Sequence, residues 1–536
     1  MARMSDITVE RNRSADDEAL GRIRRRLIKP LPMDGWWGWT LPLAITGIAL
    51  FMRLWRITRP GSKVFDETYY APDSWSLLHH GVEIDVHHAA GPPGCTSDAC
   101  GFVAHPPLGK WLIALGELIF HNTPLGWRFA SAIIGSLSIL LMARIARRLF
   151  RSTLLGVVAG LLLAFDGLEF VQSRTSMLDI FLMFWVLAAF GCLLLDRDDG
   201  RYRLADALNG PLDGSRGPWL GFRPWRWACG FCLGAACATK WDGIYWVPAF
   251  FLLALFWDAG ARRIAGAKQP LFSALLLDGM FAVLPFVVLV VVVYVASWAG
   301  WFLSDGAHAY DHDRYVQAGQ SWIAHDRAVF GGWLRYQWEI YNFHRHLAAA
   351  HPYLSRPWGW LLLARPVSYF YATPSNCGAA SCSQEVLALG NPALWWPAVP
   401  AFIVLLWRAI GRFDWRAATI VVVFAAGYVP WFWADAHHRT MFLFYMLPVV
   451  PFMVLAVTFA LGLALGRANA TQLRHGVGTV AVGAYLLAVI GCFGYLYPVL
   501  AGQSLTYNQW HSRMWFRTCD TTKDRNQHHE NAPCWI

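Results

Sequence analysis

Long apolar runs recur from Trp36 to Pro498, and they constrain the fold of this 536-residue chain more than any other feature. Hydrophobic residues make up 56% of the chain and charged residues only 15%, whereas soluble domains carry about 25% charged residues. A run of about 20 apolar residues crosses a bilayer as a helix, because the lipid core offers the backbone no hydrogen-bond partner. The sequence therefore predicts an all-α polytopic membrane protein.

Loops rich in Lys and Arg assign the two sides of the membrane, since such loops collect on the cytoplasmic side. The first ~30 residues are polar and basic, so we expect a cytoplasmic segment over 1–36 and no cleavable signal peptide. A transmembrane domain over 37–500 and an extracytoplasmic tail over 501–536 follow, in the cell membrane. The alternation of basic loops predicts eleven spans, at 37–55, 127–150, 153–169, 176–195, 227–239, 243–257, 271–297, 392–408, 415–433, 441–463 and 476–498.

Two short apolar stretches do not fit this alternation. Residues 107–120 number about fourteen and include Lys110 and Glu117, so they are too short to span. We expect them to form an interfacial helix within an external loop, 58–126. The second stretch, 358–371, is expected to be interfacial or re-entrant within an external region, 298–390, that covers the substrate.

The cysteines give an independent test of this topology. Five of the eleven lie in predicted spans, where a thiol acts as a small apolar group. The other six lie in predicted external regions, where the oxidising environment favours disulfides. We expect the pairs Cys95–Cys100, Cys377–Cys382 and Cys519–Cys534. A zinc site is the alternative, but the pairs lack the spacing and histidines of zinc ligands.

Ionisable side chains gather at the predicted outer ends of the spans. Any one of them could be a paired or snorkelling charge, and the adjacent Asp66 and Glu67 could mark a solvated loop. As a set, cations around two carboxylates suit a substrate with a phosphate and a lipid tail, because ionisable groups at membrane depth usually face a cavity. The candidate catalytic residues are Asp66 and Glu67, and the candidate substrate-binding residues are His105, Lys110, Arg128, Arg174, Asp179, Lys240, Arg365 and Arg439.

This residue set fits glycosyl transfer from a lipid-phosphate sugar. The phosphate leaves as an anion, so cations that meet the developing charge are sufficient. The attacking hydroxyl must lose a proton, which requires one carboxylate base. A hydrolase would need a second carboxyl group as the acid. One base acting from the face opposite the leaving group predicts inversion at the anomeric carbon.

The motifs resemble those of the protein O-mannosyltransferases, which have the GT-C fold. They are Phe65-Asp66-Glu67, the segment His105-Pro106-Pro107-Leu108-Gly109-Lys110, the segment 127–132, Gln172-Ser173-Arg174 with Met177-Leu178-Asp179, the segment 239–243 and the segment 439–448. The resemblance implies transfer of mannose from polyprenyl-phosphate-mannose to Ser or Thr of exported polypeptides, near the Sec translocon. By resemblance Asp66 is the base and Glu67 orients the loop or the acceptor. Lys240 would lie near the lipid phosphate, and Arg128 would contribute to the electrostatics of the cavity.

Two departures and three alternatives accompany this resemblance. The chain lacks the large β-trefoil domain of eukaryotic members, as actinobacterial members do, and a polar segment between Cys519 and Cys534 interrupts the family's C-terminal ending.

One alternative function is glycosyl transfer to a lipid or a cell-wall glycan, which would keep the same fold. A transporter would place charges midway along spans or in paired half-repeats. A divalent cation on Asp66, Glu67 and His105 is compatible with the sequence but is not demanded by the spacing. The net charge of +10 lies mostly in loops between spans, so nucleic acid is not expected.

Overall fold

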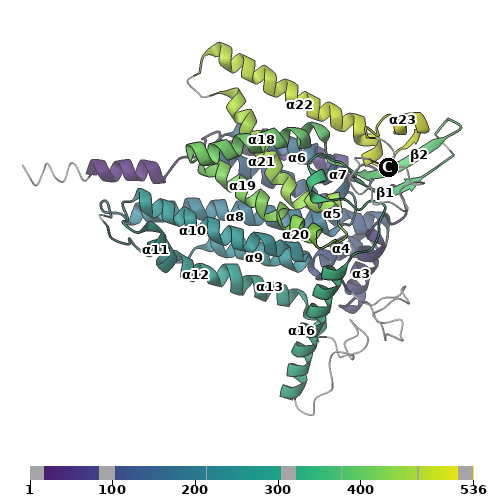
Figure 1. The fold of residues 1–536 in the computed structure, drawn as a ribbon, viewed down its shortest axis with the longest axis horizontal. Helices are drawn as coiled ribbons and strands as arrows, with labels where there is room; N and C mark the ends of the chain where they lie inside the picture. The colour runs from purple at the N-terminus through teal and green to yellow at the C-terminus, as the bar shows by residue number, and fades with distance from the viewer. Residues whose placement is uncertain are drawn as a thin grey trace, which may run out of the picture.

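A computed structural model describes residues 17–83, 103–212, 214–303, 322–375, 377–466, 470–516 and 535. Most helices run side by side along the long axis of Figure 1. Within these described ranges, nine helical segments are long and apolar enough to cross a membrane, so this is a multi-pass membrane protein. They are Trp37–Leu54, Pro124–Phe150, Leu178–Ala207, Trp241–Ile264, Pro270–Ser297, Pro392–Arg412, Trp415–Ala436, Leu443–Leu465 and Gln472–Leu500.

Each of these nine segments corresponds to a predicted span. The other two predicted spans are shorter helices, α6 (Thr153–Ala164, 12 residues) and α9 (Pro224–Thr239, 16 residues). The predicted span 153–169 ends early because Asp166 starts a separate short helix, α7 (Gly167–Gln172), and caps it by accepting from Glu169 N. The total of eleven spans therefore stays a prediction, while the helical fold is confirmed.

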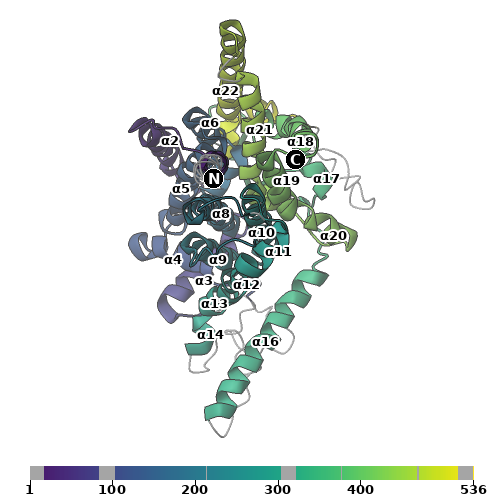
Figure 2. The same cartoon turned by 90° about the vertical axis from the view of Figure 1, so that its left-hand side faces the viewer.

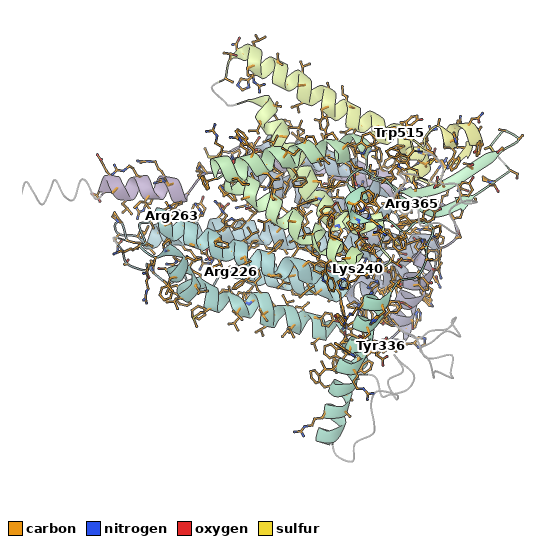
Figure 3. The ribbon with its side chains drawn as sticks, in the orientation of Figure 1. Arg226, Lys240, Arg263, Tyr336, Arg365 and Trp515 are labelled. Atoms are coloured by element: carbon orange, nitrogen blue, oxygen red, sulfur yellow. A yellow bond between two sulfur atoms is a disulfide. The ribbon has the colours of Figure 1, made fainter. Side chains whose placement is uncertain are left out.

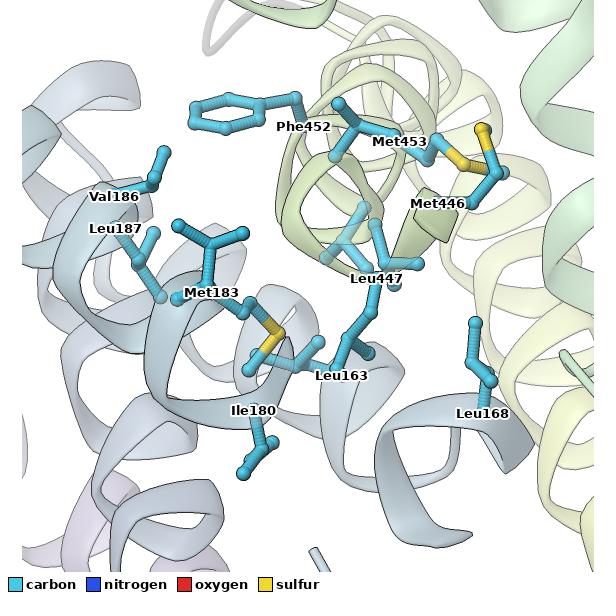
Figure 4. Close-up of a cluster of buried hydrophobic side chains, with 14 of the residues drawn as sticks. Leu163, Leu168, Ile180, Met183, Val186, Leu187, Met446, Leu447, Phe452 and Met453 are labelled. Atoms are coloured by element: carbon cyan, nitrogen blue, oxygen red, sulfur yellow. The ribbon is translucent and has the colours of Figure 1, made fainter. Parts of the chain in front are cut away.

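The centre of the bundle is α8 (Leu178–Ala207), whose apolar side chains are buried on nearly every side. It packs against α5 (Pro124–Phe150), α9 and α10 (Trp246–Ile264). Figure 4 shows its contact with the segment formed by η4 (Leu443–Val449) and α21 (Val450–Leu465), where Met183 and Leu187 lie opposite Leu447. A helix that is apolar all round is buried in this way, so α8 organises the elements that carry the site.

One end of the bundle, here called the arginine-rich end, is held by buried ion pairs. Figure 3 shows Arg226 and Arg263 in this half of the molecule. The helix α8 continues beyond the predicted boundary at residue 195, because Asp196 accepts hydrogen bonds from Arg223 (2.9 Å) and Arg226 (2.8 Å). Arg226 also reaches Asp258 of α10 over 2.6 Å. These contacts tie α8, α9 and α10 together.

The opposite end, here called the Asp66 end, carries the connecting helices. They include α3 (Glu67–His80) after α2 (Trp37–Leu54), α4 (Leu108–Phe120) before α5, and α16 (Trp322–His346). The helix α4 lies where a short interfacial helix was predicted, and it packs against α3 and α5. The remaining elements named in Figure 1 are α11 (Pro270–Ala274), α12 (Met280–Val283), α13 (Leu289–Ser297), α14 (Ala299–Leu303), α17 (Pro357–Trp360), α18 (Pro392–Arg412), α19 (Trp415–Tyr428), α20 (Pro430–Ala436), α22 (Gln472–Leu500) and α23 (Tyr507–His511).

The helical fold also includes one small sheet that the sequence did not predict. A three-stranded antiparallel sheet, in the order β1-β2-β3, lies at the Asp66 end, with β1 at Val367–Ala372, β2 at Cys382–Ala388 and β3 at Ser504–Thr506. The stretch 358–371, predicted as interfacial or re-entrant, supplies most of α17 and β1 instead. The apolar residues of this stretch are too few for a span, and they pair with β2 in a hairpin.

The disulfide Cys377–Cys382 closes this hairpin and confirms one of the three predicted pairs. Its Cα atoms are 5.8 Å apart. The pairs Cys95–Cys100 and Cys519–Cys534 lie outside the described residues.

Candidate active site

Asp66 lies at the first turn of α3, directly after the loop that leaves α2. Its side chain is partly buried, and the hydroxyl of Tyr70, one helical turn along, donates to Oδ2 over 3.4 Å. No other side-chain hydrogen bond reaches Asp66 within the described part of the chain. Burial raises the pKa of Asp66 to about 6, the charge of Lys240 opposes that rise, and Asp179 adds to it. The carboxylate therefore keeps lone pairs available for a proton, as a general base requires.

Glu67 is fully buried and has a different environment from its neighbour. Arg128 of α5 donates to both carboxylate oxygens, over 2.8 Å to Oε1 and 2.7 Å to Oε2. The backbone N–H groups of Val64 and Ser176 each donate a further hydrogen bond of 2.9 Å. Glu67 therefore fixes the loop that presents Asp66, and it joins that loop to the start of α8.

Arg128 is occupied by protein acceptors on all five of its N–H groups. Besides its three contacts with Glu67 and Ser62, Nη1 donates to the carbonyls of Ile57 (3.0 Å) and Pro60 (2.8 Å). A guanidinium has five N–H donors, so none remains for a substrate. In this arrangement Arg128 acts on the site through the loop that it holds.

Lys240 lies in the turn between α9 and the short helix η1 (Trp241–Tyr245). Its Nζ is 2.9 Å from Oδ1 of Asp179, in the first turn of α8, and 3.9 Å from Oδ2 of Asp242. It also lies 4.4 Å from the ring centroid of Tyr445, within the range of a cation–π contact. This buried cation is close enough to Asp66 to lower its pKa.

Two histidines and an arginine line the same cavity as Lys240. The rings of His105 and His344 stack with centroids 5.1 Å apart, and His344 Nε2 donates to the carbonyl of Ala104 over 2.7 Å. Arg439 Nε donates to the carbonyl of His344 over 3.0 Å. Burial lowers the pKa of His105 well below its usual value and that of His344 to about 4, so both rings are neutral near pH 7. Nδ1 of His105 is buried and has no hydrogen-bond partner among the described residues.

A cavity of ≈ 320 Å³ opens between these groups. Asp66 is not on its wall, but its partner Tyr70 has its ring 6.1 Å from that of His105, and Lys240 belongs to the wall. Three cations and several aromatic rings therefore face one space beside the carboxylate. The polar lining is His105, Lys240, Asp242, His344, Arg345, His437 and Arg439, and the aromatic lining is Trp241, Tyr245, Tyr341, Trp431 and Trp433.

Five of the eight predicted substrate-binding residues are absent from this lining. Arg128 and Asp179 are described above, and the other three are held by protein partners elsewhere. Lys110 is buried between Asp73 (2.9 Å) and Glu83 (2.6 Å), and these carboxylates raise its pKa against the opposing effect of burial. Arg174 donates to the carbonyls at the C-terminal end of α2, including that of Arg53 over 2.7 Å. Arg365 donates to the carbonyl of Pro352. Each of these contacts stabilises an element near the site.

Comparison with known proteins places the chain in a family. Residues 43–299 match the family model of dolichyl-phosphate-mannose-protein mannosyltransferase, and residues 329–519 match that of the C-terminal four-helix membrane region of protein-O-mannosyltransferase. A polyprenol-phosphate-mannose–protein mannosyltransferase of Mycolicibacterium smegmatis is 40% identical over 502 residues, which cover 90% of this chain and 93% of that protein. The chain belongs to the protein O-mannosyltransferase family. A Mycobacterium tuberculosis protein of the same name is 38% identical over 90% of this chain and 92% of its own length.

The family fold is also seen in a solved structure. The protein O-mannosyltransferase Pmt1–Pmt2 complex of Saccharomyces cerevisiae, bound to the sugar donor, aligns with a TM-score of 0.68 at 15% identity. The alignment covers 92% of this chain and 93% of that chain. At this identity the likeness shows the fold alone, which is the GT-C architecture that the motifs implied.

Several residues of the candidate site were not singled out from the sequence. Tyr70 lies four residues after Asp66, so helical spacing alone could have placed it on the same face. His344 and Tyr341 come from α16, which contains none of the segments that resemble the family. Tyr445 lies inside the quoted segment 439–448, but its ring contact with Lys240 depends on the tertiary fold.

The described part of the site can be examined for side chains that could bind a divalent cation. Among the described residues, no group of three or more His, Cys, Asp or Glu side chains is placed to hold an ion. Glu67 is unsuited as a ligand, because Arg128 and two backbone N–H groups occupy its oxygens. A cation on the set Asp66, Glu67 and His105 would therefore require the Glu67 contacts to break.

Proposed function

We propose that this chain transfers mannose from polyprenyl-phosphate-mannose to Ser or Thr hydroxyls of exported polypeptides, with Asp66 as the general base. The observation that carries the proposal is the position of Asp66, whose hydrogen bonding is unsaturated, beside a cavity lined by cations and aromatic rings. The names of the M. smegmatis and M. tuberculosis relatives support a polyprenol-phosphate-mannose donor and a protein acceptor.

The reaction follows from the charges around this cavity. The acceptor oxygen attacks the anomeric carbon of mannose while the bond from that carbon to the phosphate oxygen breaks. The hydroxyl proton passes to Asp66, whose pKa of about 6 leaves it mostly ionised at neutral pH. The electron pair of the broken bond stays on polyprenyl phosphate. Attack from the face opposite the phosphate inverts the anomeric centre.

The cations of the wall suit the phosphate. Lys240 and Arg439 both line the cavity, and charge-assisted contacts to phosphate oxygens are among the stronger hydrogen bonds. Asp179 orients Lys240 through the 2.9 Å ion pair. We assign the donor-binding role to His105 as well, since its buried Nδ1 lacks a partner in the described structure and the residue lines the cavity.

The other predicted site residues act through the framework in this proposal. Glu67 and Arg128 hold the Asp66 loop, and Arg174 holds the end of α2 from which that loop departs. Lys110 joins α4 to α3 through Asp73. Arg365 holds the segment before β1. The region 298–390 would cover the bound substrate through α16, which supplies Tyr341, His344 and Arg345 to the cavity.

We place the Asp66 end outside the cell membrane, with the N-terminus in the cytoplasm and the C-terminal tail outside. Figure 3 supports this orientation, because Arg263, in the last turn of α10 where a basic loop begins, lies in the half of the bundle away from Lys240 and Arg365. Basic residues collect on the cytoplasmic side of membrane proteins. Acceptors would then be met as they leave the Sec translocon.

The test is transfer of radiolabelled mannose from polyprenyl-phosphate-mannose to a Ser/Thr-rich peptide by the reconstituted protein. Label should enter that peptide and should not enter a matched peptide with Ala at every Ser and Thr. Asp66→Asn should reduce transfer by ~10²–10⁴. Asp206→Asn, the same chemical change at an exposed carboxylate of α8, is the matched control and should transfer normally. Label found only in lipid or glycan products would reject the protein acceptor, and transfer by Asp66→Asn at the normal rate would reject the base.

A further inference from the structure

The helix α16 runs across the direction of the membrane-spanning helices. In Figure 1 the spans lie along the horizontal axis, whereas α16 descends from the bundle near the ends of α13 and α20. Figure 2 shows the spans nearly end-on, and α16 again projects sideways beyond them. It is 25 residues long and is not one of the nine segments with the composition of a span. A helix in this position lies parallel to the membrane plane, at the level where the neighbouring spans end.

One face of α16 anchors it to the protein. Trp333, Tyr336 and Ile340 are buried against Trp298 and Trp301, at the end of α13 and in α14. The hydroxyl of Tyr336 accepts from Val103 N over 2.8 Å, and Gln337 Oε1 accepts from the hydroxyl of Tyr294 over 2.6 Å. The rotation of the helix about its own axis is therefore fixed by packing and by hydrogen bonds.

A second face of α16 is apolar and exposed. Phe330, Leu334, Trp338 and Tyr341 have exposed fractions of 49%, 49%, 61% and 37%. At about 100° of rotation per residue, these four positions fall within an arc of about 80°. No acidic position of the α16 sequence falls on this arc by the same spacing. The four residues, here called the α16 stripe, form a continuous apolar surface along the helix.

Arginines flank the stripe on the same side of the helix. Arg327 and Arg345 are exposed, and by spacing each falls within the arc, near either end of the stripe. Arg335, one position after Leu334, is also exposed but lies about 100° further round. Aromatic rings and basic residues on one face are typical of helices that lie in the interface of a bilayer, where the rings enter the acyl boundary and the cations meet phosphates.

We propose that α16 is a membrane-surface helix whose stripe enters the outer leaflet, with Arg327 and Arg345 on phospholipid phosphates. The bound partner is the phospholipid surface itself, because the stripe lies at the level of the span ends and the helix runs across them. The last turns of α16 carry Tyr341, His344 and Arg345 into the cavity, so contact with the leaflet positions one wall of the candidate active site.

The test measures the depth of single positions in the full-length protein reconstituted into phosphatidylcholine liposomes. A nitroxide is attached through p-acetylphenylalanine, which leaves the cysteines untouched, at Leu334 or Trp338 and, as the matched control, at Arg335. Apolar oxygen and a water-soluble nickel complex then compete as collision partners. We expect labels at Leu334 and Trp338 to collide several-fold more with oxygen relative to nickel than the label at Arg335 does. Adding phosphatidylglycerol should preserve this order.

Three outcomes would overturn the proposal. Equal nickel access at Leu334 and Arg335 would show that the stripe faces water. Protection at Leu334 that disappears in nanodiscs holding one protein copy would identify a second copy of the chain as the partner. Protection that appears only after polyprenyl phosphate is added would assign the stripe to the lipid tail of the donor. None of these readouts uses mannose transfer, so the result stands independently of the proposed activity.

Discussion

Two buried carboxylates at the arginine-rich end are held by ion pairs, whereas one carboxylate at the Asp66 end has almost no partner. At the arginine-rich end, Asp196 and Asp258 are shared between Arg223 and Arg226 at distances from 2.6 to 3.6 Å. At the Asp66 end, the carboxylate of Asp66 accepts one long hydrogen bond, from Tyr70. Carboxylates held by ion pairs specify a structure, whereas a partly satisfied carboxylate beside a cavity is a candidate for chemistry. The same contrast separates Glu67 from Asp66, which are adjacent in sequence.

The largest expected effect is on stability at the arginine-rich end. Arg226→Met leaves two buried carboxylates without one of their cations, which typically costs about 3–5 kcal/mol. Arg263→Met is the matched control, since Arg263 is exposed in the same half of the molecule and should change stability by less than about 0.5 kcal/mol. Reversible denaturant unfolding in detergent micelles compares the two variants. Equal stability losses would contradict the structural role of the network.

The next effect is on catalysis and concerns Lys240. Lys240→Met removes a buried cation from the cavity, and loss of one such stabilising group typically costs ~10²–10³ in rate. Lys240→Arg keeps the charge and should recover part of that loss. The measurement is kcat/KM for mannose transfer from polyprenyl-phosphate-mannose. A loss of less than about fivefold for the methionine variant would remove Lys240 from the transition-state contacts.

A smaller effect on stability is expected from the hairpin disulfide. Cys377→Ser opens a short loop, with a sequence separation of 5, so chain entropy predicts a loss of about 2 kcal/mol. Unfolding with and without reductant gives this difference, and the variant should be insensitive to reductant at this hairpin. Free thiols at both positions in non-reducing mass spectrometry would contradict the bond itself.

The smallest effect is the dependence of the rate on pH. Asp66 must be ionised to accept a proton, and its pKa is raised to about 6, so transfer should fall as the pH drops below that value. If one ionisable group controls the rate, kcat/KM should fall about tenfold for each pH unit below pH 6 and should be constant above pH 7. The pH profile of kcat/KM tests this sign. A rate that rises on acidification would exclude a carboxylate base of this pKa.

The sequence predicted the long helices because each of them is a nearly uninterrupted apolar run. The predicted span 37–55 corresponds to the helix Trp37–Leu54, and the predicted span 392–408 corresponds to the first part of the helix Pro392–Arg412. The small sheet was missed, since β1 lies within an apolar stretch that reads equally well as a short helix. The early end of α6 was missed because only the tertiary structure shows that Asp166 caps α7.

The place of the candidate site could be predicted where a sequence motif marked it. Asp66, Lys240 and Arg439 all lie at or beside the cavity, and each belongs to a quoted family segment. Lys110, Arg128 and Arg174 carried equally clear signals, but the structure shows their donors occupied by protein acceptors. Charge and position in the sequence do not distinguish a cation that binds substrate from one that holds a loop, because that difference depends on its partners.

The different roles of Asp66 and Glu67 are tested by comparing Asp66→Asn with Glu67→Gln in the same preparation. For each variant, mannose transfer per folded molecule and free energy of unfolding are measured together. We expect Asp66→Asn to lower the transfer rate by ~10²–10⁴ and to keep the stability of the parent protein. Glu67→Gln should lose about 3–5 kcal/mol of stability, because Arg128 then keeps a buried charge without its carboxylate. Normal transfer by folded Asp66→Asn would contradict the central claim.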